Sequence, residues 1–291
     1  MRSPGRRRPG PAAAPRWLGA LAVAAFSLGG LPAACAAPAP KAAVGPAAEA
    51  IRRGIASGTR RFDAAAWDAL VSRHLGSEGT VDYAGFRRDR GSLDAFLDAV
   101  ARTELAMLSR AELLALLVNA YNACTVRLIL DNARDGAFPG IRDVADPWGR
   151  PICTVGGEAL SLDTIEHGLL RPLFLDNRIH AAVNCAARSC PPLAPWAFRG
   201  ERVDAQLDER MRSMVDSDLH VRIEDGALLV SRIFDWYRAD FLPDGGFSNP
   251  APTIRDYLLR HAGPDRRRAL EALGPAPKIR FLDYDWSLNG R

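Results

Sequence analysis

The apolar stretch from Ser109 to about Leu130 constrains the fold more than any other segment of the chain. It opens with Ser-Arg-Ala-Glu, the spacing of a capping box, in which a serine hydroxyl and a glutamate side chain satisfy free N–H groups at a helix start. The predicted helix is apolar on nearly all sides, which is typical of a helix buried in a core. We therefore expect the rest of the chain to pack around it.

Two amide side chains, Asn119 and Asn122, interrupt this apolar helix. They lie within roughly 60° of each other around the helix axis, so both face the same neighbour. A buried amide without a partner costs about 1–3 kcal/mol, so each amide must find one. Two interpretations stay open: the amides hold the backbone of a neighbouring loop, or one of them orients His180 or donates to a developing oxyanion.

Reactive side chains concentrate between Ser161 and Leu193, a segment that holds two of the five histidines and two of the five cysteines. Ser161 can cap a helix there, and at 100° per residue Glu166 falls in its apolar arc. A buried carboxylate must be paired or protonated. Glu166 is therefore predicted either to satisfy buried backbone donors or to act as an acid or base. His167 and Asp163, on the opposite side, are predicted to form a surface pair.

The next segment, Ile179–Asn184, is predicted to be a short strand whose alternation turns His180 toward the interior. A histidine in that position is either a core residue with satisfied hydrogen bonds or a base. Cys185 ends the predicted strand, and Cys190 precedes two prolines. In an extended chain these cysteines lie about 16 Å apart, against a Cα limit of roughly 7 Å for a disulfide. A bridge between them would need a tight turn and is not predicted.

Four motifs resemble those of a known family: LLALLVNAYNACTVRLIL, GGEALSLDTIEHGLLR, RIHAAVNCAARSCPPL and FLDYDWSLN. With these motifs in order, the chain from about Phe62 to Asn289 resembles domain of unknown function 547 (DUF547), a family without an assigned activity. The resemblance implies that eight residues occupy signature positions of the family: Asn119, Tyr121, Asn122, Glu166, His180, Cys185, Ser189 and Pro191.

The N-terminus has the pattern of an export signal. The first 34 residues contain five arginines and no acid, Trp17–Leu31 is apolar, and small residues follow, so residues 1–36 are predicted to be a signal peptide. Its removal changes the net charge from +4 to −1, which leaves no basic patch and no expected nucleic-acid partner. Cys35 leaves two alternatives open, a lipidated anchor in a membrane or cleavage and release. We expect an exported protein that is periplasmic, secreted or membrane-anchored as a lipoprotein.

The remaining chain is predicted to fold as one unit. Residues 37–60 are rich in Ala and Pro and are predicted to be a linker, and residues 61–291 a single domain. Many helices and several short strands, without regular alternation of strand and helix, predict an α+β fold. We expect a mainly helical domain with a small sheet of short strands and with hairpins at Ile152–Leu160 and Leu219–Val230.

Further features bear on where a ligand could bind. The loop Asn132–Arg150 is long for a compact domain, which is typical of a segment that covers a binding site. Trp236 and Tyr237, on the predicted helix after Ser231, are expected to be core residues rather than a ligand platform. Because an exported protein meets an oxidising compartment, disulfides are allowed among the four remaining cysteines. These are Cys124, Cys153, Cys185 and Cys190.

Two catalytic functions fit this pattern. In a hydrolase or acyl-transfer enzyme, Cys185 would be the nucleophile and His180 its base. One of Glu166, Asn119 and Asn122 would orient that base. An extended strand separates His180 from Cys185 by about 16 Å, so this mechanism requires the chain to fold back at Asn184, or His167 or another base to approach Cys185. In the second version, Glu166 and His180 transfer protons without help from the thiol.

The third function is a non-catalytic binding or interaction module of the cell envelope, with the polar cluster as an internal scaffold. Its partner would be a small molecule or a peptide. A metal site would have to combine His167, His180, Cys185 and Cys190. Their spacing matches no common zinc pattern, so neither a metal nor another cofactor is expected.

Overall fold

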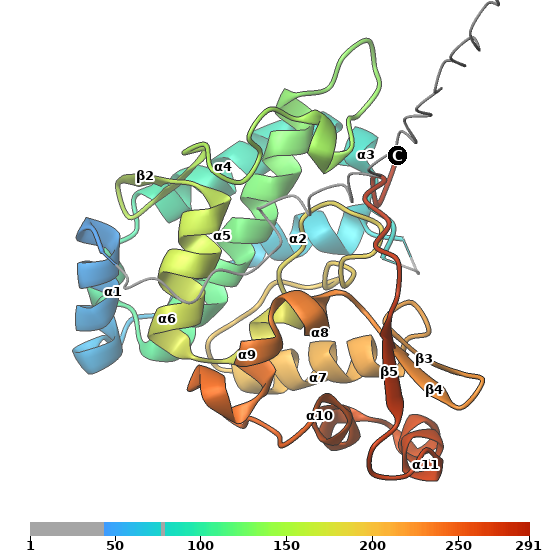
Figure 1. The fold of residues 1–291 in the computed structure, drawn as a ribbon. Coiled ribbons are helices and arrows are strands. Elements are labelled where there is room, and N and C mark those ends of the chain that lie inside the picture. The colour runs from blue at the N-terminus through green and yellow to red at the C-terminus, as the bar shows by residue number, and fades with distance from the viewer. Residues whose placement is uncertain (1–43, 77–78) are drawn as a thin grey trace, which may run out of the picture.

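The computed structural model describes residues 44–76 and 79–291. The predicted signal peptide and Cys35 lie outside the described residues. Helix α5 (Arg110–Asp131) runs through the middle of the N-terminal half (Figure 1) and begins as predicted, with the Ser109 hydroxyl accepting a hydrogen bond from the Glu112 N–H at 3.3 Å. It is long and apolar enough to cross a membrane, but 94% of that apolar window is buried by the protein. The prediction of a buried central helix is confirmed.

The N-terminal helices pack around α5. One of them, α1, corrects a prediction, because it lies inside the segment interpreted as a linker. Its Ala47, Ala48 and Ile51 are buried. Gly54 lets α1 lie close to the backbone of Leu105, because a Cβ added at Gly54 would lie 2.6 Å from the Leu105 carbonyl oxygen. The elements are α1 (Pro46–Ser57), α2 (Ala65–His74), α3 (Tyr83–Arg88), α4 (Arg90–Ala101) and η1 (Leu105–Met107).

Two small sheets accompany the helices, as an α+β fold requires. Strands β1 (Cys153–Val155) and β2 (Glu158–Leu160) form the first predicted hairpin, whose turn residues Gly156 and Gly157 both have positive φ, as a two-residue type I′ turn demands. In the second sheet β4 (Ala227–Val230) is the central strand. It pairs antiparallel with β3 (Val221–Glu224) and parallel with β5 (Lys278–Phe281). The predicted fold class is confirmed.

The C-terminal half forms a second hydrophobic cluster beside the first. After β5 the chain returns along the molecule toward α3 (Figure 1), and its Leu288 and Gly290 form single bridges with Ala187 and Val81. Trp236 and Tyr284 pack against both hydrophobic clusters. The remaining elements are η2 (Ile141–Asp143), α7 (Val203–Asp216), α8 (Ile233–Trp236), α9 (Arg238–Phe241), η5 (Pro243–Gly245), α10 (Ile254–His261) and α11 (Pro264–Ala272).

Around the polar segment one local prediction was wrong and a second was correct only in part. The segment Ile179–Asn184 is not a strand; its first part lies in a 3₁₀ turn, η4 (Asn177–Ala181), which the Asp176 side chain caps by accepting from the Arg178 N–H. A short apolar run cannot be assigned to strand or helix by its pattern alone. The helix after Ser161 forms, but most of it is the π-helix η3 (Thr164–Leu170), followed by α6 (Arg171–Phe174).

Candidate functional site

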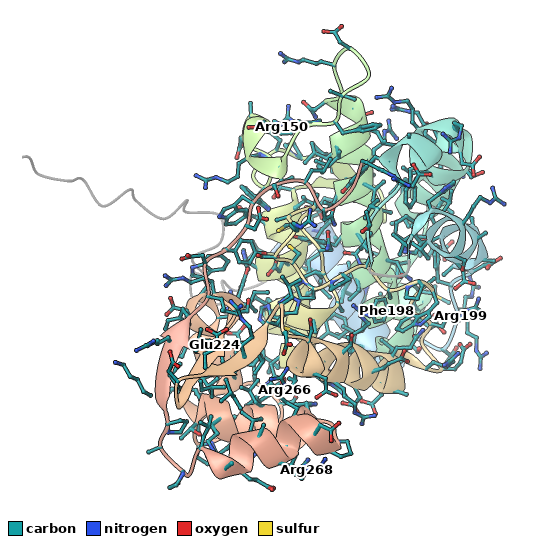
Figure 2. The ribbon with its side chains drawn as sticks, turned by 90° about the vertical axis from the view of Figure 1, so that its right-hand side faces the viewer. Arg150, Phe198, Arg199, Glu224, Arg266 and Arg268 are labelled. Carbon is teal, nitrogen blue, oxygen red and sulfur yellow. A yellow bond between two sulfur atoms is a disulfide. The ribbon has the colours of Figure 1, made fainter. Side chains whose placement is uncertain are left out.

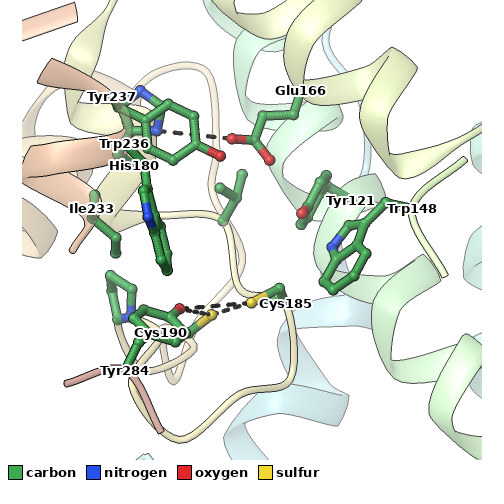
Figure 3. A pocket seen from close by; sticks show the side chains of 12 residues that line it. Tyr121, Trp148, Glu166, His180, Cys185, Cys190, Ile233, Trp236, Tyr237 and Tyr284 are labelled. Atoms are coloured by element: carbon green, nitrogen blue, oxygen red, sulfur yellow. Dashed lines mark hydrogen bonds and ion pairs between the residues drawn. The ribbon is translucent and has the colours of Figure 1, made fainter. Parts of the chain in front are cut away.

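A pocket lies where the two hydrophobic clusters meet, and it contains three of the five predicted site residues, Glu166, His180 and Cys185. Its empty volume is about 420 Å³, part of it open to solvent. Figure 3 shows Glu166 and the two thiols on opposite sides of the pocket, with aromatic rings along the walls. The lining residues are Tyr121, Trp148, Glu166, His180, Val183, Cys185, Cys190, Pro191, Ile233, Trp236, Tyr237 and Tyr284.

The π-helix brings Glu166 into the pocket, where its side chain is buried. Burial alone would raise the pKa of Glu166, but nearby His167 and His180, a hydrogen bond from the Tyr237 hydroxyl, and Arg171 together hold this pKa below its ordinary value. The carboxylate is therefore ionised inside an apolar pocket. The prediction that Glu166 is buried and partnered is correct.

His167 was predicted to form a surface pair with Asp163; the pair forms, but His167 is not at the surface. His167 is buried, its Nε2 lies 3.9 Å from Asp163, and Arg171 Nη1 lies 3.3 Å from its Nδ1. The π-helix explains the difference, because its i→i+5 hydrogen bonds change the angle between successive side chains from the 100° assumed for an α-helix. Since a guanidinium can only donate, Nδ1 of His167 is the acceptor.

His180 is held by a carboxylate that sequence analysis missed. Its Nε2 lies 2.8 Å from Oδ2 of Asp240, and its ring packs on Tyr237 with 3.9 Å between the ring centroids. Because a carboxylate accepts, Nε2 carries a proton and donates it to Asp240. Nδ1 lies 3.9 Å from Oε1 of Glu166. The structure thus pairs His180 with carboxylates on both nitrogens.

Asp240, on α9, is fully buried and also binds Arg171 with two hydrogen bonds, from Nε and Nη2, each of 2.7 Å. Burial raises the pKa of Asp240, but the hydrogen bonds from His180 and Arg171 lower it more, so its pKa is below the ordinary value. The sequence offered no signal for Asp240 beyond one acid between aromatic residues. Its partners are 60 and 69 residues away.

The two cysteines of the pocket lie together. Both are free thiols and buried, and the Cys185 N–H donates to the sulfur of Cys190 at 3.2 Å. The Tyr284 hydroxyl lies 3.1 Å from the same sulfur. Burial would raise the pKa of Cys190, but hydrogen bonds from the Cys185 thiol, the Tyr284 hydroxyl and backbone N–H groups lower it below the ordinary value. Cys190 is therefore ionised more readily than an ordinary cysteine.

A tight turn brings these thiols together, which the extended-chain argument did not predict. Ala186 has a φ of 62°, in the left-handed region that disfavours side chains other than those of glycine, asparagine and aspartate. The Asn184 side chain stabilises the turn by accepting from the Ala186 N–H at 2.8 Å, and the C-terminal Asn289 N–H donates to the Ala186 carbonyl oxygen. The structure's disulfide joins Cys124 to Cys153 instead.

The two amide side chains of α5 form hydrogen bonds with backbone groups of neighbouring segments. Asn122 donates to the Ala182 carbonyl oxygen and accepts from the Asn184 N–H, both at 2.9 Å. Asn119 binds both backbone groups of Phe198, which Figure 2 labels in the interior, beside the surface residue Arg199. Neither amide lines the pocket. Of the two interpretations left open, the contacts match the structural one.

Aromatic residues supply much of the pocket wall. Trp148 comes from the long loop Asn132–Arg150, which was predicted to cover a site. Trp236 and Tyr237 were predicted to be core residues, yet both line the pocket. The Trp236 indole N–H has no hydrogen-bond partner among the described residues. Aromatics at a helical spacing look the same in sequence whether they face a core or a pocket, so the pattern could not decide.

Within residues 44–76 and 79–291, no group of three or more His, Cys, Asp and Glu side chains is arranged to hold a metal ion.

Comparison with known proteins identifies one family. Residues 105–215 match the model of the family described as "Protein of unknown function, DUF547". The matched segment contains α5, the pocket residues Glu166 and His180, and both thiols. Asp240, Tyr284 and the fourth motif lie beyond the matched segment. No curated protein and no solved structure matches the chain. The resemblance carried by the motifs is confirmed over this segment: residues 105–215 match the model of the DUF547 family.

Proposed function

We propose that the pocket is the active site of an exported hydrolase or acyl-transfer enzyme. A thiol of the Cys185–Cys190 pair accepts the acyl group, and the chain Glu166–His180–Asp240 activates the water or amine that removes it. One observation carries the proposal: the two thiols and this acid–base chain line or adjoin the same pocket, on opposite sides of it.

The acid–base side has the parts of a general base. Asp240 fixes the proton on Nε2 of His180, as the aspartate does in a Ser-His-Asp triad, and so keeps Nδ1 free to take a proton. Glu166 is the second acceptor beside Nδ1. A water or amine between them would lose its proton to His180 as it attacks the acyl group.

The thiol side has the parts of an activated nucleophile. The thiolate is the reactive form of cysteine, and donors aimed at the sulfur favour it. The Cys190 sulfur receives hydrogen bonds from the Cys185 N–H and the Tyr284 hydroxyl. The strained Ala186 beside Cys185 agrees with a site held in one geometry by its surroundings.

Export is part of the proposal. It is supported by the composition of residues 1–36 and by the Cys124–Cys153 disulfide, because disulfides persist mainly in oxidising compartments. Attachment to a membrane through a lipidated Cys35, and a small-molecule or peptide ligand, belong to the same proposal.

The test is a search for the acyl-enzyme. Incubation with p-nitrophenyl acetate, followed by mass spectrometry of the digested protein, should place an acetyl group on Cys185 or Cys190, and a double Cys→Ser variant should lose it. His180→Gln should slow the removal of the acetyl group by about 10²-fold or more. His261→Gln, a histidine outside the pocket, is the matched control and should behave like the wild type.

An acetyl group found only on lysine, such as the exposed Lys278, with unmodified thiols, would contradict the enzymatic proposal. It would leave the binding module as the better account of the pocket.

A further inference from the structure

The turn between Cys185 and Cys190 brings two free thiols into contact. The Cys185 N–H lies 3.2 Å from the Cys190 sulfur, and the Cys185 thiol is a hydrogen-bond partner of the Cys190 thiol. The Tyr284 hydroxyl oxygen lies 3.1 Å from the Cys190 sulfur and 3.8 Å from the Cys185 sulfur, so one oxygen contacts both (Figure 3). Sulfur atoms in such contact need only a small movement to form an S–S bond of about 2.05 Å.

Backbone contacts with the C-terminal segment hold this turn in place. The Arg188 N–H donates to the Ser287 carbonyl oxygen at 2.8 Å. The Ser189 N–H donates to the Asp285 carbonyl oxygen at 3.1 Å. Because the folded chain already keeps the two sulfur atoms together, the closure of a bridge is an intramolecular reaction between positioned groups, which is fast compared with a reaction between separate molecules.

The two thiols differ in their access to small molecules. Both line the pocket with the aromatic walls, but Cys190 also lines a second pocket, part of it open to solvent, together with Arg188 and Pro192. Burial opposes the ionisation of Cys190, but its hydrogen bonds hold its pKa below the ordinary value, which increases the thiolate fraction at neutral pH. Cys190 is therefore placed to attack an incoming reagent, with Cys185 beside it.

We propose that Cys185 and Cys190 form a redox-active pair, which low-molecular-weight disulfides oxidise to an internal disulfide and low-molecular-weight thiols reduce again. The proposed export would place the pair in a compartment where disulfides persist. Formation of the bridge does not depend on acyl transfer. Its consequence for catalysis rests on the proposed function: the bridge takes up both thiols and so inactivates the enzyme.

The oxidation balances as two thiol–disulfide exchange steps. The Cys190 thiolate attacks one sulfur of a small disulfide, RSSR, so the S–S bond of RSSR breaks and one RSH leaves after taking up a proton. The Cys185 thiolate then attacks the Cys190 sulfur, so the mixed disulfide breaks and a second RSH leaves. The two cysteines lose two electrons and two protons, and RSSR gains both. Reduction by a small thiol runs the same steps in reverse.

The experiment uses trypsin, because cleavage after Arg188 puts the two cysteines on separate peptides, residues 179–188 and 189–199. The full chain is incubated with oxidised glutathione without denaturant, and the remaining thiols are then blocked with iodoacetamide in denaturant before digestion. Mass spectrometry should find the two peptides joined by a disulfide. The mixed disulfide with glutathione should be at least about tenfold less abundant, since Cys185 displaces glutathione intramolecularly. Dithiothreitol should restore the separate, alkylated peptides.

Two matched variants assign the order of attack. Cys185→Ser should keep glutathione on Cys190 as a stable mixed disulfide, because the thiol that displaces it is gone. Cys190→Ser should take up glutathione on Cys185 at least about tenfold more slowly than Cys185→Ser takes it up on Cys190. Circular dichroism checks that both variants fold. A faster reaction of Cys190→Ser would overturn the assigned order.

Wild-type peptides that stay separate, with an alkyl group on each cysteine, would overturn the inference. A mixed disulfide that persists in the wild type would do the same, because the two sulfur atoms would then be unable to exchange. Acetylation by p-nitrophenyl acetate before and after oxidation separates this result from the proposed function. A bridge without an acyl-enzyme in the reduced protein would refute the enzyme alone, and an acyl-enzyme without a bridge would refute the redox-active pair alone.

Discussion

Acid should destabilise this protein through one buried histidine outside the pocket. His220, between α7 and β3, has no exposed surface, and neither of its ring nitrogens has a hydrogen-bond partner among the described residues. Burial, with a smaller effect from the Arg210 guanidinium, lowers the pKa of His220 to about 4, from 6.5. The folded protein therefore resists a proton that the unfolded chain accepts.

The sign and size of the change in the free energy of unfolding follow from the difference between the pKa of His220 in the folded and in the unfolded state. At neutral pH His220 is neutral in both states and contributes nothing. As the pH falls below 6.5 the unfolded chain binds the proton, so the free energy of unfolding decreases until the pH nears 4. The loss approaches about 1.4 kcal/mol per pH unit and reaches about 2 kcal/mol at pH 5.

Urea unfolding of the wild type and of His220→Leu, each at about pH 7.5 and about pH 5, isolates this effect. Leucine fits an apolar site and cannot titrate. His261, whose pKa burial also lowers, titrates in both proteins and cancels. The wild type should lose about 2 kcal/mol more than the variant between the two pH values. Equal losses would refute the reasoning, because His220 would then hold a partner that keeps its pKa ordinary.

Three further outcomes are expected. Replacing Cys124 and Cys153 by alanine should lower the free energy of unfolding in urea by about 3–4 kcal/mol, because their bridge closes a loop with a sequence separation of 29. Asp240→Asn should cost about 3–5 kcal/mol in the same assay, since it leaves a buried guanidinium without its carboxylate. Tyr284→Phe should raise the pKa of Cys190 and so slow its alkylation by iodoacetamide at neutral pH, as followed by mass spectrometry. An unchanged free energy of unfolding in either of the first two variants, or an unchanged alkylation rate in the third, would contradict the stated role of the disulfide, the ion pair or the hydrogen bond.

The sequence predicted those parts of the fold that depend on local signals. The capping serine and the all-round apolar pattern located α5, and paired turn residues located both hairpins. The turn at Ala186 was not predictable, because its conformation depends on Asn184, Asn122 and the distant Asn289. An extended-chain distance assumes that no such partners exist.

The site was predictable only as far as its residues share one segment. Glu166, His180 and Cys185 were singled out because they lie close together in sequence. Asp240 and Tyr284 reach the pocket from the C-terminal third of the chain, through contacts 60 to 99 residues long. Contacts between residues so far apart in the chain produce no periodic pattern in the sequence.

The residues that the resemblance places at signature positions divide, in the structure, into two physical classes. Asn119 and Asn122 hold backbone, and so does Ser189, whose hydroxyl accepts from the Asp285 N–H. Glu166 and His180 line the pocket. Truncating a residue of the first class leaves buried backbone groups unpaired, which costs about 1–3 kcal/mol of stability for each group.

The two classes therefore predict separable defects. Replacing Asn122 by alanine should lower the free energy of unfolding, while the residual folded protein keeps an intact set of pocket side chains. Replacing Glu166 by glutamine should change ligand binding without leaving any backbone group unpaired. A shared motif alone cannot separate these roles, since both classes sit in the same few segments. Only the contacts show that the amides of α5 hold the backbone of Phe198, Ala182 and Asn184, whereas Glu166 and His180 line the pocket.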